Sequence, residues 1–582
     1  MASNTPQFYR LIKMDCQMDC QAFKTKLHKN APDVDVICYY DKAYGKESQI
    51  RNARFSYKPY CIVKCGKSSD VVQVVNFCRI KEMSVRIRSG GHHHEGMCSA
   101  DDVVIIDLSN MKEILPPEVS TSDGATTICI EPGAKLEDIN RELGSDGYIL
   151  PGGGCGTVNV GGLVQGGGWG MLARKGGLTC DALQEVELVL ANGNIICASN
   201  DNDNEYRDLF WAIKGGGGGN FGIITKYKFN LMKSQSVWLV VLRYSSNDES
   251  LLTELLAFYL NKLETFDHNI TSFARVSHYD DDKKVERPTF KITFQCLGND
   301  NNAYKAVDDF IQELKDIERN GIIFFKSVDY SPQLSVHQAF SVLNGVLPAP
   351  SEAQQNNGEA EWNSRDLGAF TLQPLNKTIT PGSSNALNAA SFSTTCGGES
   401  FLHKVSSAFP KGGTDINNLS QKIIEFIIDN DDFPKAAAYL SIHSLGGEIK
   451  TKNPSSSSFF YRDKEFILQF QVWWPEESSS QKDESIQYIQ WIENFRSNLD
   501  HAGLIEGAFI NFADRDIPVP PTSELDNRQT SELDDRLSLL KYYYGENLNQ
   551  LRETKTKYDP HNFFSFAMSI PTLPGGSNAK RE

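Results

Sequence analysis

A short polar run between two expected strands is the first feature that could do chemistry. Residues 88–92 read Arg-Ser-Gly-Gly-His, and the flanking segments 84–87 and 103–108 are predicted strands. An arginine beside a glycine pair suits a pyrophosphate, because the guanidinium supplies charge and the loop supplies backbone N–H donors. The alternatives are a metal site at the histidines 92–94 and an incidental exposed loop. Adjacent residues in an extended loop point in different directions, so we expect no metal.

Glycine is concentrated between Pro151 and Gly222, where 19 of 72 residues are glycine. The clusters are interrupted by regular patterns, since 183–190 alternates like a strand and 207–214 has the pattern of a short helix. Ordered glycine lets the backbone approach a ligand closely and leaves its N–H groups available to bind. The distribution therefore favours a phosphate-bearing cofactor, with tight turns inside an all-β core as the alternative.

These glycines do not fit a Rossmann dinucleotide site. Residues 217–222 match the spacing G-x-G-x-x-G, but a predicted helix precedes them and a predicted strand, 223–229, follows. The Rossmann site needs its glycines between a strand and a helix N-terminus. A second match, residues 168–173, has no clear strand ahead of it. We therefore reject the Rossmann interpretation.

Composition limits the classes of partner. The 582 residues include 58 Lys and Arg against 74 Asp and Glu, a net charge of −16, which argues against nucleic acid as the main partner. No apolar run reaches the roughly 18–20 residues that span a bilayer. The N-terminus lacks the basic start and apolar core of a secretory signal. We expect no nucleic acid or membrane partner and a cytoplasmic location.

The thirteen cysteines are spread along the chain rather than clustered. They run from Cys16 to Cys396 without any C-x-x-C spacing. Such a distribution in a long chain predicts mostly reduced, buried thiols and gives little support to a structural zinc site.

Several motifs taken together resemble the berberine-bridge-enzyme-like flavoproteins, which are related to vanillyl-alcohol oxidase and p-cresol methylhydroxylase (PCMH). They cover 40–235 and 505–572, and their shared order and spacing make the resemblance specific. The matching segments are residues 88–92, 153–162, 166–170, 174–178, 208–216 and 555–564.

The resemblance implies an α+β fold with a PCMH-type FAD-binding domain built from two separate segments. These segments would be residues 41–235 and 506–573. An α+β substrate-binding domain, an antiparallel sheet covered by helices, would be inserted at 236–505. Residues 1–40 would form an N-terminal extension and 574–582 a tail.

The resemblance also implies FAD held by two covalent bonds, one from a histidine nitrogen to the 8α-methyl group and one from a cysteine sulfur to C6. His92 and Cys155 match these positions, and the glycines beside Cys155 would let its sulfur reach a flat ring. The expected cofactor-binding residues are Arg88, Ser89, Gly90, Gly91, His92, Cys155, Gly156, Thr157, Val158, Val160, Gly161, Gly162, Trp169, Gly222, Ile223 and Asn511.

The implied reaction is hydride transfer from an alcohol or amine carbon of a small molecule to FAD, while a base takes a proton. In the family, a small residue three positions after the cysteine accompanies reoxidation by O2, which gives H2O2, and here that residue is Val158. The alternatives are a catalytically altered flavoprotein that binds a ligand and a dehydrogenase with another electron acceptor. A sugar, an alkaloid-like or a polyketide-like substrate remains open.

The proton acceptor is where the chain departs from the family. Family members carry an Asn-Tyr-x-Asp stretch whose tyrosine takes the proton, but residues 511–514 here read Asn-Phe-Ala-Asp. Phe512 has no hydroxyl, so the base is expected elsewhere in the substrate domain. Alternation along the predicted strand 466–474 places Gln469, Gln471 and Trp473 on one face, which could orient a polar substrate. The candidate bases, in order of preference, are His443, Tyr461 and Glu448, with Tyr439 favoured less.

Overall fold

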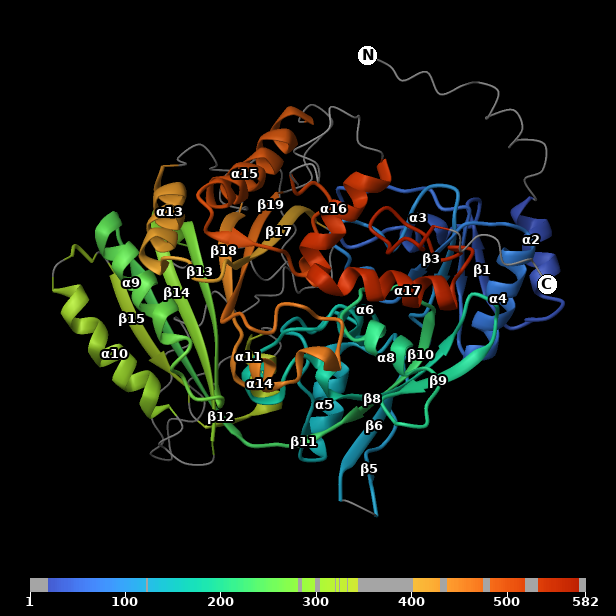
Figure 1. The fold of residues 1–582 in the computed structure, drawn as a ribbon, viewed down its shortest axis with the longest axis horizontal. Helices are drawn as coiled ribbons and strands as arrows, with labels where there is room; N and C mark the ends of the chain where they lie inside the picture. Colours follow the sequence, from blue (N-terminus) through green and yellow to red (C-terminus); the bar gives the residue numbers. More distant parts are fainter. Residues whose placement is uncertain are drawn as a thin grey trace.

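A computed structural model shows two groups of elements with the C-terminal helices packed beside one of them (Figure 1). One group contains the N-terminal strands β1 to β10, and the other contains the long strands from β12 to β19 with their helices. The described residues are 19–121, 124–280, 285–298, 304–319, 321–323, 325–331, 333–343, 401–429, 437–474, 482–518 and 532–574. This mixture of helices and mostly antiparallel sheets confirms the predicted α+β class.

The N-terminal sheet has the strand order β1-β2-β4-β3, antiparallel between β1 and β2 and parallel elsewhere. Helix α4 covers it through Val71, Val74, Val75 and Cys78, which recur at helical spacing and are buried. The α4 helix begins at Ser68, and its N-cap residue, Lys67, makes no side-chain cap because a lysine side chain has no acceptor. The Ser68 hydroxyl donates to Glu187. The elements are α2 (Cys20–Leu27), β1 (Asp35–Cys38), α3 (Tyr44–Glu47), β2 (Cys61–Lys64), α4 (Ser68–Ile80), β3 (Val85–Arg88) and β4 (Val104–Asp107).

A second sheet of five antiparallel strands follows, in the order β5-β6-β10-β8-β9. The glycine-rich segments run between its strands as loops and short helices. The elements are β5 (Glu118–Val119), β6 (Thr126–Ile130), α5 (Leu136–Ser145), β7 (Tyr148–Ile149), α6 (Val160–Gln165), α7 (Ala173–Gly176), β8 (Leu183–Val189), β9 (Ile195–Ser199), α8 (Arg207–Ile213), β10 (Ile223–Asn230) and β11 (Met232–Lys233).

The largest sheet has nine strands among the described residues, in the order β15-β12-β14-β13-β18-β19-β17-β20, with β16 beside β12. Apolar residues such as Leu468 and Phe470 point toward the helices on one face, while Gln469 and Gln471 between them point to the other. The strands are β12 (Ser236–Ser245), β13 (Ile270–Asp280), β14 (Val285–Leu297), β15 (Phe325–Tyr330), β16 (Leu334–Ser335), β17 (Leu402–Pro410), β18 (Ala437–Ser444), β19 (Phe466–Trp474) and β20 (Ile505–Glu506).

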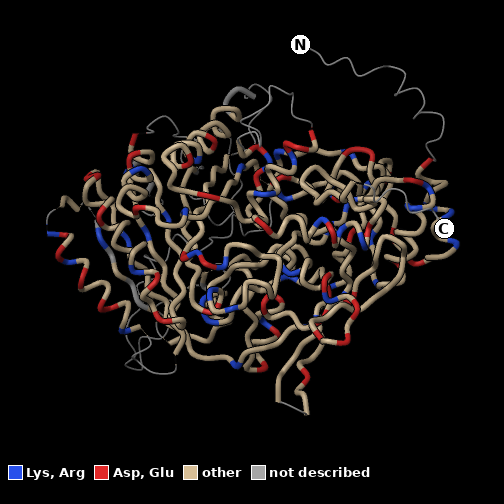
Figure 2. The backbone as a smooth tube through the Cα atoms, viewed as in Figure 1, with Lys and Arg blue, Asp and Glu red and all other residues tan. Residues whose placement is uncertain are grey.

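Helices cover this sheet, and further helices complete the N-terminal group. In Figure 1, α16 and α17 lie close to the N-terminal strands although they come from the end of the chain. Figure 2 shows acidic residues spread over the described elements, with basic residues interspersed. The remaining helices are α9 (Glu249–Lys262), α10 (Lys305–Glu318), α11 (Val336–Leu343), α13 (Ile416–Ile428), α14 (Gly447–Thr451), α15 (Lys482–His501), α16 (Glu532–Tyr544) and α17 (Leu548–Tyr558).

One cysteine pair departs from the expectation of reduced thiols. Cys20 in α2 and Cys38 in β1 form a disulfide, because the turn between these elements brings the helix back over the strand. The other nine cysteines of the described residues are thiols. Among the helices that the structure describes, none is both long and apolar enough to span a membrane.

Candidate active site

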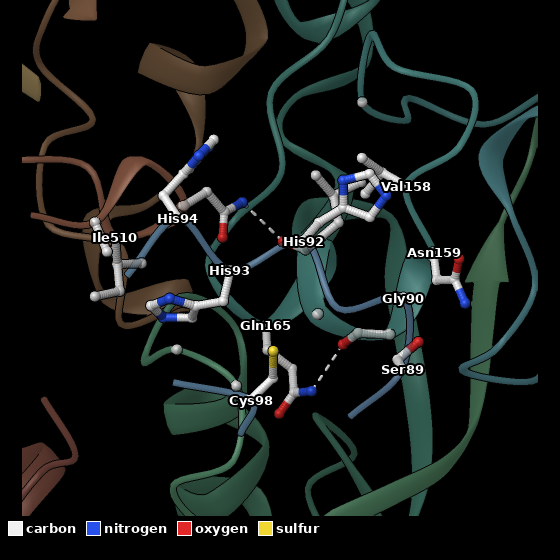
Figure 3. A pocket seen from close by; sticks show the side chains of 18 of the residues that line it. Ser89, Gly90, His92, His93, His94, Cys98, Val158, Asn159, Gln165 and Ile510 are labelled. Carbon is white, nitrogen blue, oxygen red and sulfur yellow. Dashed lines mark hydrogen bonds between the residues drawn. The ribbon is translucent and has the colours of Figure 1, made fainter. Parts of the chain in front are cut away.

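A cavity of about 390 Å³ lies between the glycine-rich loops and the polar face of the large sheet. One wall comes from the loop after β3 and from the segments around residues 153–169 and 217–222. The opposite wall comes from β17, β18 and β19, and the turn at 510–513 closes one side. Figure 3 shows the consecutive histidines His92, His93 and His94 turned in three directions, as expected for an extended loop.

His92 follows β3 and points toward Val158 (Figure 3). Its Nε2 lies 3.0 Å from the carbonyl oxygen of Thr157, which only accepts hydrogen bonds, so Nε2 carries the proton. Burial lowers the pKa of His92 to about 3, so the ring is neutral at ordinary pH and Nδ1 keeps a lone pair. Cys155 lines the same wall, and its sulfur lies 3.8 Å from the Thr157 hydroxyl oxygen.

Several cavity-lining glycines present bare backbone. A Cβ added at Gly154 or Gly162 would meet no atom within 4 Å, and one at Gly218 or Gly219 would meet only side-chain atoms, at 3.6 Å or more. Side chains at these four positions would therefore project into open space instead of packing against protein. Such a wall suits a flat ring and a phosphate group that the backbone must approach closely.

The opposite wall carries a row of side chains joined by hydrogen bonds. Trp473 determines which atom donates and which accepts along this row. The indole Nε1–H of Trp473 only donates, and it lies 3.2 Å from Oε1 of Gln471. Gln471 therefore donates through Nε2 to Oε1 of Gln469, at 2.9 Å. The same Gln469 oxygen accepts from Nε2 of His443, at 2.8 Å. The predicted placement of Gln469, Gln471 and Trp473 on one strand face is confirmed, and all three line the cavity.

This row of hydrogen bonds determines which ring nitrogen of His443 carries the proton. With its proton on Nε2, His443 carries a lone pair on Nδ1, and that atom is buried without a hydrogen-bond partner among the described residues. Burial lowers the pKa of His443 to about 4, so the ring is neutral. Trp169 meets it edge-on, with centroids 4.4 Å apart, and the Phe512 ring lies 5.0 Å away.

Two family models match the segments that build the first wall and the turn at 510–513. The FAD binding domain model matches residues 59–199, and the berberine and berberine-like model matches residues 508–571. With these domains and its relatives, the chain is an FAD-linked oxidoreductase that is similar to the berberine-bridge-enzyme-like proteins.

Curated relatives span nearly the whole oxidoreductase. It is 26% identical to the uncharacterized FAD-linked oxidoreductase YgaK of Bacillus subtilis, over 92% of this chain and 97% of that protein. It is 27% identical to berberine bridge enzyme-like 12 of Arabidopsis thaliana, over 90% and 87%.

Solved structures share the fold at lower identity. Berberine bridge enzyme from Eschscholzia californica matches with a TM-score of 0.71 at 20% identity, over 94% of this chain and 99% of that one. A chitooligosaccharide oxidase matches with a TM-score of 0.69 at 19% identity, over 96% and 100%. These likenesses confirm the predicted fold class.

The cavity of this oxidoreductase contains most, but not all, of the residues predicted to bind FAD. Thr157 acts through its backbone carbonyl on His92, and the Gly156 carbonyl accepts from the backbone of Glu137. Val160 and Ile223 are fully buried in the apolar cores. The predicted residues that line the cavity are Ser89, Gly90, Gly91, His92, Cys155, Val158, Gly161, Gly162, Trp169, Gly222 and Asn511. Those outside its wall are Arg88, Gly156, Thr157, Val160 and Ile223.

Arg88 differs most from its expected role of pairing with a pyrophosphate. Its Nε lies 2.6 Å from Oδ2 of Asp107, and both side chains are buried. The two residues are register partners on β3 and β4, so the parallel pairing of these strands brings them together. Asp107 therefore neutralises the charge that the motif suggested for the ligand.

Two of the four candidate bases, Tyr461 and Glu448, lie away from the cavity, whereas His443 and Tyr439 line it. The Tyr461 hydroxyl donates to the backbone carbonyl of Tyr542 at 2.5 Å, and its ring packs on Phe409 in the core, so burial raises its pKa. Glu448 is partly exposed on α14, with Lys452 3.8 Å away. Neither residue lines the cavity, because the loop between β18 and β19 turns both away from the sheet face; His443 does line it.

Sequence reasoning missed several members of the wall. His94 and His403 face each other across the cavity edge, and Gln165 donates to the carbonyl of Gly161. No local pattern marks His403, which stands in a strand rich in serine. Its role depends on a contact with a residue 309 positions away, which spacing along the chain does not reveal.

Proposed function

We propose that this oxidoreductase is an oxidase that removes a hydride from an alcohol or amine carbon of a small molecule and is reoxidised by O2, giving H2O2. One observation carries the proposal: the His443 side chain lines the cavity together with the glycine-rich wall, and its Nδ1 is buried without a hydrogen-bond partner among the described residues. A lone pair held without a partner in a wall of otherwise satisfied side chains suits a group that receives a proton.

FAD would lie along the first wall. Bare backbone at the glycines fits its flat ring and its phosphates, and when bound it supplies the two-electron acceptor. Attachment through His92 and Cys155 is supported by the Thr157 carbonyl, which leaves Nδ1 of His92 as the nucleophilic nitrogen. Cys155 lines that wall too, which supports its sulfur as the source of the second bond.

His443 would act on the opposite side of the substrate. As the substrate carbon gives up its hydride, the hydroxyl O–H bond breaks, its proton goes to Nδ1 of His443, and a carbonyl forms. Gln469 holds the imidazole in the required tautomer through its bond to Nε2. General-base help of this kind accelerates such steps about 10²–10⁴-fold.

Val158 supports O2 as the electron acceptor. Its small side chain lines the cavity close to His92 (Figure 3), which leaves room for a diatomic molecule beside the bound ring. A longer side chain would fill that space.

The sheet topology supports the proposed division of the chain. The four- and five-stranded sheets lie within 41–235, except for β1 (Asp35–Cys38), which lies wholly before residue 41. The nine-stranded sheet occupies 236–505 with only its last residue beyond. The segment 506–573 returns to the first group, where Lys555 donates to the carbonyl of Asn220. We propose these as the two FAD-binding segments and the substrate domain.

Anaerobic titration tests the function. Oligosaccharides and aromatic alcohols are added to the flavin-loaded protein, and bleaching of the flavin absorbance reports hydride transfer. Air is then admitted, and H2O2 is measured against reoxidation by a dye or quinone. Bleaching followed by H2O2 formation supports the oxidase, whereas fast turnover only with the dye reassigns it as a dehydrogenase. Failure to bleach with every compound would favour an altered flavoprotein, as Phe512 suggests.

A further inference from the structure

His94 and His403 form a pair at the edge of the cavity, where the loop after β3 meets the start of β17. Nδ1 of His94 lies 3.1 Å from Nε2 of His403, and the rings cross at 88°. Both residues line the cavity, and neither has a role in the proposed hydride step. Burial lowers the pKa of His94 to about 3 and that of His403 well below its usual value, so both rings are neutral.

The positions of the protons in this pair follow from one backbone carbonyl. Nδ1 of His403 lies 3.0 Å from the carbonyl oxygen of Phe401, so Nδ1 must donate and Nε2 must accept. His94 therefore donates to His403 through Nδ1, and its own Nε2 keeps a lone pair. Among the described residues, no group donates to that nitrogen.

A buried seam fixes the pair in place. The Asn52 amide donates to the carbonyl oxygens of both His94 and His403, at 2.6 and 3.0 Å. The next residue along each segment is also connected to its counterpart, since Lys404 lies 3.1 Å from Glu95 and both side chains are fully buried. Trp473 stacks on the His403 ring with centroids 4.1 Å apart. These contacts hold His94 at the cavity edge.

A cluster of charged side chains adjoins the His94–His403 pair, and its cations and anions are equal in number. Lys404 pairs with three carboxylates, and Arg515 and Arg54 approach the same Glu95. The cluster contains three cations and three anions: Arg54, Lys404 and Arg515 with Glu95, Asp514 and Asp516. Within this cluster each cation has an anion as its partner, and a neutral hydroxyl would find an acceptor at His94.

Other histidines that line the cavity already use ring nitrogens in hydrogen bonds to the backbone. Nδ1 of His93 accepts from the backbone N–H of Glu95, and Nε2 of His92 donates to Thr157. Apart from the proposed flavin link at His92, two lone pairs remain, Nδ1 of His443 and Nε2 of His94. The Phe512 ring is near both, with centroids 5.0 Å from His443 and 6.2 Å from His94.

We propose that Nε2 of His94 accepts a hydrogen bond from a second O–H or N–H group of the substrate, with His403 as the residue that fixes its tautomer. This inference rests on the proposed oxidase function, in which the first such group gives its proton to His443. The substrate class is then a neutral molecule with at least two hydrogen-bond donors, and a compound with a single hydroxyl group would be bound less well.

Chemical modification of the flavin-loaded protein tests the lone pair directly. Diethyl pyrocarbonate adds an ethoxycarbonyl group to an unprotonated imidazole nitrogen, with loss of CO2 and ethanol, and peptide mass mapping locates it. We expect modification of His94 but not of His403, with exposed His561 as the internal reference. Under anaerobic conditions, benzene-1,3-dimethanol, whose second hydroxyl can bond to His94, should protect His94 severalfold relative to His561, and benzyl alcohol, which has only one hydroxyl, should not. An unreactive His94, or equal effects of the two probes, overturns the proposal.

A matched pair of variants tests the role of His403. His403→Phe keeps a ring against Trp473 but removes the acceptor, whereas His403→Gln loses the ring but keeps an oxygen that can accept from His94. We expect modification of His94 to fall about fivefold in His403→Phe, which corresponds to about 1 kcal/mol for one hydrogen bond, and to stay near the parent value in His403→Gln. Nitrogen-15 spectra of labelled histidine should show the proton of His94 moving from Nδ1 to Nε2 in His403→Phe alone. The same tautomer in all three proteins contradicts the assignment.

These readouts separate the inference from the proposed function, because neither depends on turnover. If flavin is bleached but His94 is unreactive, the inference fails and the oxidase remains. If His94 behaves as expected and no compound bleaches the flavin, the oxidase fails and His94 remains a ligand-anchoring residue.

Discussion

The two walls of the cavity are built by different means. The wall proposed for FAD consists largely of backbone, with glycines that face open space and an arginine, Arg88, that is neutralised by Asp107. The sheet wall consists of side chains whose proton positions are fixed by hydrogen bonds, from Trp473 through Gln471 and Gln469 to His443. A backbone wall suits a constant ligand, while a side-chain wall can be altered one residue at a time.

The strongest test of the cofactor wall is the double variant His92→Ala, Cys155→Ala. We expect acid precipitation to leave the yellow flavin with the parent protein and with either single variant, because one covalent bond is enough to hold it. The double variant should release all its flavin. Measuring absorbance in pellet and supernatant decides the matter, and complete release from the parent would show that no covalent bond exists.

The sheet wall is tested by His443→Phe, which keeps the aromatic packing against Trp169 and removes the lone pair. Loss of a general base predicts flavin reduction slower by about 10²–10⁴-fold in anaerobic stopped-flow experiments. The matched control is Tyr461→Phe, which removes a hydroxyl bonded to a backbone carbonyl away from the cavity and should leave the rate unchanged. Equal rates in the parent and in His443→Phe would remove His443 from the reaction.

Replacing Phe512 by the tyrosine that family members carry tests further whether His443 is the base. Phe512 lines the cavity beside His443, so Phe512→Tyr places a hydroxyl near the lone pair. We expect no gain in flavin reduction if His443 is the working base. A large gain would show that the chain has lost a base that the wall has not replaced.

The variant Val158→Leu tests the wall proposed for FAD through the rate of reoxidation by O2, and its expected effect is smaller. The longer side chain fills space next to the bound ring, so reoxidation by O2 should slow about tenfold, equivalent to about 1.4 kcal/mol of barrier. Val158→Ala is the control, because it adds no volume and should leave reoxidation at least as fast. Stopped-flow mixing of reduced protein with aerated buffer measures both, and equal rates for the leucine and alanine variants would contradict steric gating.

The smallest expected effect concerns pH and stability. Burial lowers the pKa of His93 and His443 to about 4 and that of His94 to about 3, from an ordinary value near 6.5. The unfolded chain therefore binds more protons, so stability is complete above pH 6.5 and is lost as pH falls toward 4. Melting temperatures should decline by several degrees over this window. His93→Asn, whose amide oxygen can still accept from Glu95, should show a shallower decline, and an unchanged slope would exclude His93 as a contributor.

The cofactor half of the site could be largely anticipated because its features are local. Gly90, Gly91 and Gly162 stand in runs whose composition favours backbone exposed to a ligand, and they do line the cavity. Errors arose where a side chain found a partner on another strand. Arg88 was assigned to a pyrophosphate, but the parallel register of β3 and β4 places Asp107 next to it.

The catalytic half could be anticipated only in part. Strand alternation, a property of the chain alone, placed Gln469, Gln471 and Trp473 on one face. It could not separate His443 from Tyr461, because that depends on the loop between β18 and β19, which carries Tyr461 into the core.

The sequence by itself determined the α+β class, the glycine loops and the residue types offered to the cofactor, since these follow from composition and from patterns a few residues long. Only the tertiary structure decided where the protons sit. The lone pair on His443 depends on a row that begins at Trp473, and the lone pair on His94 depends on His403 and the carbonyl of Phe401. A neutral histidine carries one proton on either of two nitrogens, and partners brought together by the fold select which one.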